Sequence, residues 1–262
     1  MLLKDKVIVV SGIGPGLGMK LAIEAAREGA RGIVLAARSA AKLDDAQERV
    51  RDVSPTCESL KVVTDIRDPA QCVYLVQVAT AQFGRIDGLV NSAFEHGAFE
   101  PVETGDLAQW QAAYQTNVMG SMQMTRAVAP VMKARGSGAV VMINTMATIK
   151  PFIGEAGYAA SKGALLVATK YLAIELGPSN IRVNTARMGW MWGAPVQGFV
   201  EHTARTQGIP QEQIVDGIAA NIPLRRVVTD DECARAALFL VSDYASAITG
   251  AVLDVNGGEA LS

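Results

Sequence analysis

Residues 11–18 read SGIGPGLG, and they directly follow an apolar run at residues 7–10. A helical pattern begins at once after them, because Leu17, Leu21 and Ala25 recur at every fourth position. A helix that starts just after a buried strand offers unpaired backbone N–H groups to a phosphate, and glycines let the backbone come close to it. We therefore interpret residues 11–18 as a phosphate-binding loop. A flexible turn without a ligand is the alternative.

Similar β-rich runs recur along the whole chain. They cover residues 33–37, 60–64, 86–91, 139–144, 181–185 and 251–255, and helical patterns separate them. This alternation predicts a single α/β domain over residues 1–262, with a Rossmann-like, doubly wound parallel sheet of about seven strands and helices on both faces. Residues 188–222 depart from the pattern and mix Gly, Pro and Trp, which predicts a substrate-binding loop or lid.

The composition excludes several classes of protein. The 262 residues include 24 Lys and Arg against 26 Asp and Glu, which argues against a nucleic-acid partner. Three distant cysteines, Cys57, Cys72 and Cys233, fit neither a disulfide framework nor a metal site. No segment has the pattern of an export signal or a membrane span. We therefore expect a cytoplasmic protein with no membrane partner and a small-molecule substrate.

The end of the second predicted strand bears on which dinucleotide binds. It reads Ala36-Ala37-Arg38-Ser39, with no acidic residue, and Arg38 lies twenty positions after Gly18. An acidic side chain there binds a ribose 2′-hydroxyl, whereas an arginine accommodates a 2′-phosphate. Arg38 and Ser39 therefore favour NADP(H), and NAD(H) stays possible. A solvated surface arginine is the alternative interpretation.

Tyr158 and Lys162 form the second informative pattern. They open a helical pattern at residues 158–176, and a spacing of four places them on one helix face. A phenol titrates near pKa ~10, and a neighbouring ammonium would bring that pKa toward the working range of an acid–base catalyst. Such a tyrosine could give a proton to a carbonyl oxygen as hydride arrives. Alone, such a pair is in most cases an amphipathic tyrosine and a surface lysine, so its meaning depends on the other motifs.

Taken together, these motifs resemble the short-chain dehydrogenase/reductase (SDR) family over essentially the whole chain. The resemblance rests on the order and spacing of residues that include Gly12, Gly16, Gly18, Asp65, Asn91-Ser92-Ala93-Phe94, Asn117, Tyr158, Lys162, Ile248-Thr249-Gly250 and Asn256-Gly257-Gly258. It implies hydride transfer between a nicotinamide and a substrate carbon. It also implies a homo-oligomer, usually a tetramer, formed through the helices that carry Asn117 and Tyr158.

The resemblance also implies roles for single residues. Tyr158 would be the acid/base, Lys162 would bind the nicotinamide ribose and depress the pKa of Tyr158, and Asn117 would hold a water in a proton relay. Thr145 would polarise the substrate carbonyl. Asp65 and Ile66 would contact the adenine, and Asn91 to Ala93 would line the adenine-ribose side. The predicted cofactor contacts are therefore Ser11, Gly12, Gly16, Leu17, Gly18, Arg38, Ser39, Asp65, Ile66, Asn91, Ser92, Ala93, Tyr158, Lys162, Gly189 and Met191.

The chain departs from the family pattern at three places. Thr145 stands where a serine is usual, thirteen residues before Tyr158. It keeps the hydroxyl but adds a methyl group that stiffens χ1. Phe94 puts a ring where glycine is common. After the sixth strand, Met188-Gly189 replaces Pro-Gly, and Gly193 replaces a threonine that often binds the carboxamide.

Bulky side chains gather on the segments expected around the nicotinamide. They are Phe94, His96, Phe152, Met188, Trp190, Met191, Trp192 and Phe199. They favour an apolar pocket for an alicyclic, terpenoid-like or steroid-like secondary alcohol or ketone, although core or subunit contacts are the alternative. His96 is interpreted as a pocket wall or a surface residue and not as catalytic. The predicted enzyme is an NAD(P)-dependent alcohol dehydrogenase or carbonyl reductase. A C=C reductase, an isomerase and a catalytically silent NAD(P) sensor stay open.

Overall fold

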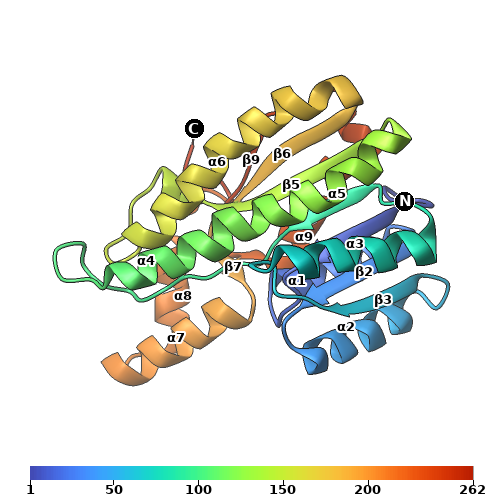
Figure 1. The fold of residues 1–262 in the computed structure, drawn as a ribbon. Helices are drawn as coiled ribbons and strands as arrows, with labels where there is room; N and C mark the ends of the chain where they lie inside the picture. Colours follow the sequence, from blue (N-terminus) through green and yellow to red (C-terminus); the bar gives the residue numbers. More distant parts are fainter. Residues whose placement is uncertain (262) are drawn as a thin grey trace.

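The centre of the molecule is a seven-stranded parallel sheet in the order β3-β2-β1-β4-β5-β6-β9 (Figure 1). The structure is a computed structural model that describes residues 1–261. The strands are β1 (Val7–Ser11), β2 (Gly32–Ala37), β3 (Glu58–Val63), β4 (Gly88–Asn91), β5 (Gly138–Thr145), β6 (Ile181–Met188) and β9 (Val252–Val255). The seven predicted runs all form strands of this sheet. The order reverses between β1 and β4, which places a binding crevice at the carboxyl ends of these strands.

Helices cover both faces of the sheet, as predicted. One face packs against α1 (Leu17–Arg27), α2 (Ala40–Val53) and α9 (Asp230–Val241). The other packs against α3 (Pro69–Phe83), α5 (Ser121–Arg135) and α6 (Ala156–Leu176). Asp68 followed by Pro69 predicts a helix cap with proline at the first helical position. This cap of α3 is present, because the Asp68 carboxylate accepts from the Ala70 N–H at 2.8 Å.

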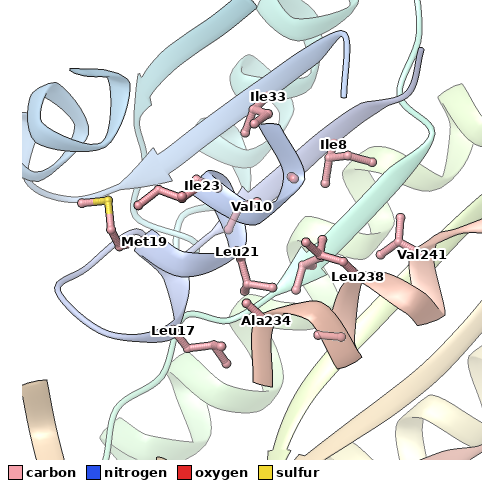
Figure 2. Close-up of a cluster of buried hydrophobic side chains, with 14 of the residues drawn as sticks. Ile8, Val10, Leu17, Met19, Leu21, Ile23, Ile33, Ala234, Leu238 and Val241 are labelled. Carbon is pink, nitrogen blue, oxygen red and sulfur yellow. The ribbon is translucent and has the colours of Figure 1, made fainter. Parts of the chain in front are cut away.

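Strands β1 and β2 are almost wholly apolar because both of their faces are buried. Along β1, Val7 and Val9 point into one core, whereas Ile8 and Val10 point into the other. Figure 2 shows the second of these cores, where Ile8, Val10 and Ile33 of the strands meet Leu21 of α1 and Leu238 of α9. The start of α1 is thus fixed against the sheet directly after β1.

Two local structures were not foreseen. Helix α4 (Leu107–Tyr114) runs into a π-helical turn at Gln115–Gly120, which continues into α5. Residues 188–222, expected as a loop or lid, form β7 (Met191–Trp192), α7 (Ala194–Gln207) and α8 (Gln211–Ala219). β7 pairs with β8 (Val228–Thr229), and α7 and α8 stand away from the sheet (Figure 1).

Three further expectations concern disulfide bonds, metal sites and membrane-spanning helices. Cys57, Cys72 and Cys233 are buried free thiols. Within residues 1–261, no cluster of side chains is suited to a metal ion. In the same part of the chain, no helix has the length and apolar character needed to cross a membrane.

Candidate active site

A cavity of about 720 Å³ runs along the carboxyl edge of the sheet, a volume typical of cofactor sites. It begins at the glycine loop and Arg38 and extends to Tyr158 and Lys162. Most of the predicted site residues line it, namely Gly12, Gly16, Leu17, Gly18, Arg38, Ser39, Asp65, Ile66, Ser92, Ala93, Thr145, Tyr158, Lys162, Gly189 and Met191. The fold therefore brings together residues that are far apart in the sequence.

Three predicted site residues do not line this cavity. Ser11 and Asn91 are buried beneath it, where the Ser11 hydroxyl donates to Asn91 Oδ1 at 3.4 Å. Asn91 Nδ2 in turn donates to Thr125 Oγ1 at 3.1 Å. Both side chains thus tie strands and helix together below the cavity floor, and direct cofactor contact through them stays a prediction.

Asn117, the third, is fully buried in the π-helical turn. Its Oδ1 accepts from the Glu95 N–H at 2.8 Å, and its Nδ2 donates to the Glu95 carbonyl at 2.9 Å. The same Nδ2 donates to Ser161 Oγ at 2.8 Å, and Ser161 Oγ donates to the Tyr158 carbonyl at 2.7 Å. Asn117 therefore clamps residue 95 to the turn of α6 that carries Tyr158. The predicted relay water stays a prediction.

The glycine loop has the shape that a phosphate cradle needs. Gly12 adopts φ +97°, and a Cβ there would lie 2.3 Å from the Ala93 nitrogen. A Cβ on Gly18 would lie 2.1 Å from the Gly12 carbonyl oxygen, so α1 can approach the loop this closely only with glycine. No side chain caps the start of α1 at Gly16. The N–H groups there are available to an anion, so the loop fits a dinucleotide pyrophosphate.

The end of the cavity beside Arg38, away from Tyr158, is lined by cationic side chains. Arg38, Lys42 and Arg67 line it, together with the Asp65 carboxylate. Arg67 forms a bidentate ion pair with Asp65, with the closest N–O distance at 2.6 Å. The hydrogen bond from Arg67 lowers the pKa of Asp65, and the Arg38 charge lowers it further. Among the described residues Arg38 has no ion-pair partner within 4.0 Å, so its charge is available to a ligand.

At the opposite end, β5 and α6 bring three reactive side chains together. Thr145 ends β5, and the Ala147 N–H donates to its Oγ1 at 3.2 Å. The hydroxyl hydrogen of Thr145 is therefore not used by this contact, and the Thr145 hydroxyl lowers the pKa of the Tyr158 phenol. Lys162 is buried, and its Nζ donates to the Ile143 carbonyl at 2.8 Å. Asn144 Nδ2 fixes α6 on β5 by donating to the Lys162 carbonyl at 2.9 Å.

Burial dominates the pKa values of Tyr158 and Lys162. Burial raises the pKa of Tyr158, the Glu155 carboxylate raises it further, and the hydrogen bond from Thr145 lowers it. Burial also lowers the pKa of Lys162 to about 7. Burial is the largest influence on both groups, and the lowering of the Tyr158 pKa by Lys162 stays a prediction.

The bulky residues expected around the nicotinamide divide into two groups. Phe94, Met188 and Met191 line the cavity. Trp190 packs near Phe152 and Phe199, with ring centroids 6.3 and 5.5 Å away, and these rings with His96 and Trp192 lie outside the cavity lining. Phe199 is exposed, so part of the expected pocket faces solvent.

Several cavity residues escaped the sequence reasoning. Lys42 lies in the first turn of α2, four residues after Arg38, and this short spacing could have indicated that both reach the cavity. Arg67 follows Asp65 by two residues, which was a similar signal. Asp230 had no such signal, because it reaches the cavity only through the pairing of β8 with β7. Its carboxylate occupies the space beside Gly193, where a Cβ would lie 2.6 Å from Oδ2.

Comparison with known proteins agrees with this geometry. A short-chain dehydrogenase family model, described as enoyl-(acyl carrier protein) reductase, matches residues 12–259. The chain belongs to the short-chain dehydrogenase/reductase family. As a member of the SDR family it is an NAD(P)-dependent oxidoreductase.

Similar SDR proteins align over nearly the whole chain. Levodione reductase of Leifsonia aquatica is 31% identical over 97% of this chain and 94% of its own. A 3α-hydroxysteroid dehydrogenase of Mediterraneibacter gnavus is 31% identical over 98% of both chains. The crystal structure of L-sorbose reductase from Gluconobacter frateurii, complexed with NADPH and L-sorbose, is 29% identical, covers 99% of this chain and 98% of its own, and superimposes with a TM-score of 0.92.

Proposed function

We propose that this SDR enzyme transfers a hydride between NADP(H) and a secondary alcohol or its ketone. The observation that carries the proposal is the convergence of Thr145, Tyr158 and Lys162 at one end of a cavity whose other end is cationic. The nicotinamide supplies or accepts the hydride when it is bound. The protein's own groups then have to bind the substrate oxygen and move its proton.

Each of the three side chains has a role that follows from its position. The Thr145 hydroxyl is oriented by the Ala147 N–H, so it can donate to a substrate carbonyl oxygen. Tyr158 gives its phenolic proton to that oxygen in reduction and takes it back in oxidation. Lys162 binds the nicotinamide ribose and, when protonated, favours the phenolate of Tyr158.

The preference for NADP(H) over NAD(H) rests on the cationic end. Arg38, Lys42 and Arg67 line it, and Asp65 is already bound to Arg67. A 2′-phosphate adds charge that these cations stabilise through charge-assisted hydrogen bonds, whereas a free 2′-hydroxyl gains little from them. Solved structures with similar folds include both an NADPH-bound ketoreductase and an NAD⁺-bound xylitol dehydrogenase, so the preference is proposed from this chain's own residues.

For the substrate we propose a bulky, weakly polar cyclic alcohol or ketone. Phe94, Met188 and Met191 give the catalytic end of the cavity an apolar lining. Residues 188–222, with α7 and α8, act as the lid over this end, within one NAD(P)-binding domain of residues 1–262. The similar 3α-hydroxysteroid dehydrogenase is consistent with this class, whereas the L-sorbose reductase acts on a polar sugar.

A substrate panel tests this proposal. The purified protein would be offered cyclic apolar alcohols and ketones beside matched polyols, each with NADPH, NADP⁺, NADH and NAD⁺. We expect the highest kcat/KM with an apolar cyclic substrate and the phosphorylated cofactor. Faster turnover of the polyols would contradict the apolar pocket. Cofactor binding without net oxidation or reduction of any member would favour the silent sensor, and product formation without net cofactor change would favour an isomerase.

Reduction of a carbon–carbon double bond is the second candidate. The description of the matching family model, enoyl-(acyl carrier protein) reductase, favours it. The two reactions differ in their products from an α,β-unsaturated cyclic ketone, because carbonyl reduction gives an allylic alcohol and C=C reduction gives a saturated ketone. We expect the allylic alcohol, since Thr145 and Tyr158 are arranged to bind and protonate an oxygen.

For assembly and location we propose a cytoplasmic homo-oligomer, most simply a tetramer. Val167, Tyr171 and Ile174 are 55%, 64% and 74% exposed and lie on one face of α6. Apolar side chains at helical spacing are suited to packing against a second copy. Light scattering on the wild type and on Ile174→Lys tests this, with a smaller mass expected for the variant.

A further inference from the structure

The ring of Tyr158 is covered by an imidazole that the function has not yet used. His96 stacks on Tyr158 with the ring centroids 4.5 Å apart and the planes inclined by 24°. Phe99 stacks on His96 at 4.1 Å and 22°. The rings of Phe99, His96 and Tyr158 therefore form a stack with His96 in the middle. Phe99 is 68% exposed and forms the outer layer.

The backbone next to His96 is held more firmly than its irregular segment would suggest. Glu95 is bonded through both its N–H and its carbonyl to the amide of Asn117, at 2.8 and 2.9 Å. The same amide reaches the Tyr158 carbonyl through Ser161 Oγ. Asn117 thus fixes the segment that carries His96 and the helical turn that carries Tyr158 relative to each other, so the stack has a rigid support.

Hydrogen bonding does not explain this position of the imidazole. His96 Nδ1 is buried and has no partner among the described residues. Nε2 lies 3.9 Å from Glu155 Oε1, too far for a hydrogen bond. The close contacts of His96 are therefore made by the two faces of its ring. One face lies on Phe99 and the other on the phenol of Tyr158.

We propose that His96 is a positioning residue for Tyr158, because its ring fixes the plane of the phenol that exchanges the substrate proton. The inference rests on the proposed role of Tyr158. Proton transfer needs the phenol oxygen within hydrogen-bond reach of the substrate oxygen, with its O–H directed at it. Rotation about χ1 would move the oxygen away, and rotation about χ2 would turn the ring plane and the direction of the O–H. Lys162 and Thr145 line the cavity on one side of the phenol, and His96 stacks on its ring from the loop.

Two substitutions of His96 distinguish the contribution of its aromatic ring face from that of its nitrogen atoms. His96→Ala removes the middle ring, so we expect kcat to fall about 10-fold or more while the Kd of NADPH and the melting temperature change little. His96→Phe keeps an aromatic face, so we expect kcat within about 3-fold of the wild type. Wild-type kcat in His96→Ala would overturn the proposal. Equal losses in both variants would also overturn it, since the nitrogens would then be what matters.

A spectroscopic measurement tests the stack without turnover. The chain has two histidines, so His202→Phe assigns the two imidazole signals in protein labelled with ¹³C-histidine. We expect the His96 signal to be displaced upfield by the neighbouring rings, and to move downfield in Tyr158→Ala but not in the control Tyr74→Ala. An unmoved signal in Tyr158→Ala would overturn the proposal even if His96→Ala failed to fold. Full activity of Tyr158→Phe would instead contradict the proposed function itself.

Discussion

The Nζ atom of Lys162 lies 5.9 Å from the centre of the Tyr158 ring, one helical turn away on α6. Lys162 is 2% exposed, and its Nζ donates to the Ile143 carbonyl. Most buried lysines have an acidic partner, yet no ion pair joins Lys162 to a carboxylate in residues 1–261. The position therefore costs stability, as is common where a charged group serves a reaction.

The first prediction concerns Lys162→Met. Burial lowers the pKa of Lys162 to about 7 from an ordinary value of 10.5. Because the folded pKa lies below the unfolded one, the folded state disfavours the protonated amine, fully below pH 7 and less as pH rises toward 10.5. Lys162→Met should therefore raise the free energy of unfolding by about 1–2 kcal/mol near neutral pH and by less in alkali, while turnover is lost.

Urea unfolding at several pH values measures this directly. The control is Lys170→Met, an exposed lysine on the same helix that should leave stability nearly unchanged. A gain in Lys162→Met that grew with rising pH would contradict the assigned direction of the pKa shift.

The second prediction concerns the threonine at the usual serine position. Thr145→Ser keeps the hydroxyl that the Ala147 N–H orients, so kcat should stay within about 3-fold. Thr145→Val keeps the shape but loses the donor to the substrate oxygen, so kcat should fall by about 10²–10³. Steady-state kinetics of the two variants provide the measurement, and equal rates would mean that Thr145 only ends its strand.

The third prediction concerns cofactor choice. Arg38→Ala removes a cation from the proposed 2′-phosphate site, so the KM for NADPH should rise about 10-fold or more and the KM for NADH should barely change. Arg51→Ala, in α2 with its side chain 68% exposed, is the matched control and should alter neither value. Parallel loss of affinity for both cofactors in Arg38→Ala would show that the arginine does not read the phosphate.

The sequence was sufficient for the parts of the fold that depend on local pattern. Apolar runs such as residues 7–10 became buried strands, and Asp68 became the cap of α3, because each depends only on its neighbours. The same holds for Tyr158 and Lys162, whose spacing of four survives in any helix. The parallel sheet and the cavity at the carboxyl ends of its strands followed from general rules for such sheets.

Apart from Lys42 and Arg67, which local spacing could have indicated, the contacts that sequence reasoning missed depend on tertiary packing. Asp230 reaches the cavity through strand pairing at Thr229, and His96 reaches Tyr158 because Asn117 clamps Glu95. The raised pKa of Tyr158 has the same origin, since desolvation is a property of the assembled pocket and not of a motif.

The central claim is that Tyr158 exchanges the substrate proton, and Tyr158→Phe tests it most directly. The variant keeps the ring against His96 but has no phenolic proton. Turnover and the Kd of NADPH would be measured on the same preparation, the second by fluorescence of the bound nicotinamide. The account predicts a loss of turnover of about 10³-fold or more with the Kd nearly unchanged. Turnover close to the wild type, with cofactor still bound, would contradict it.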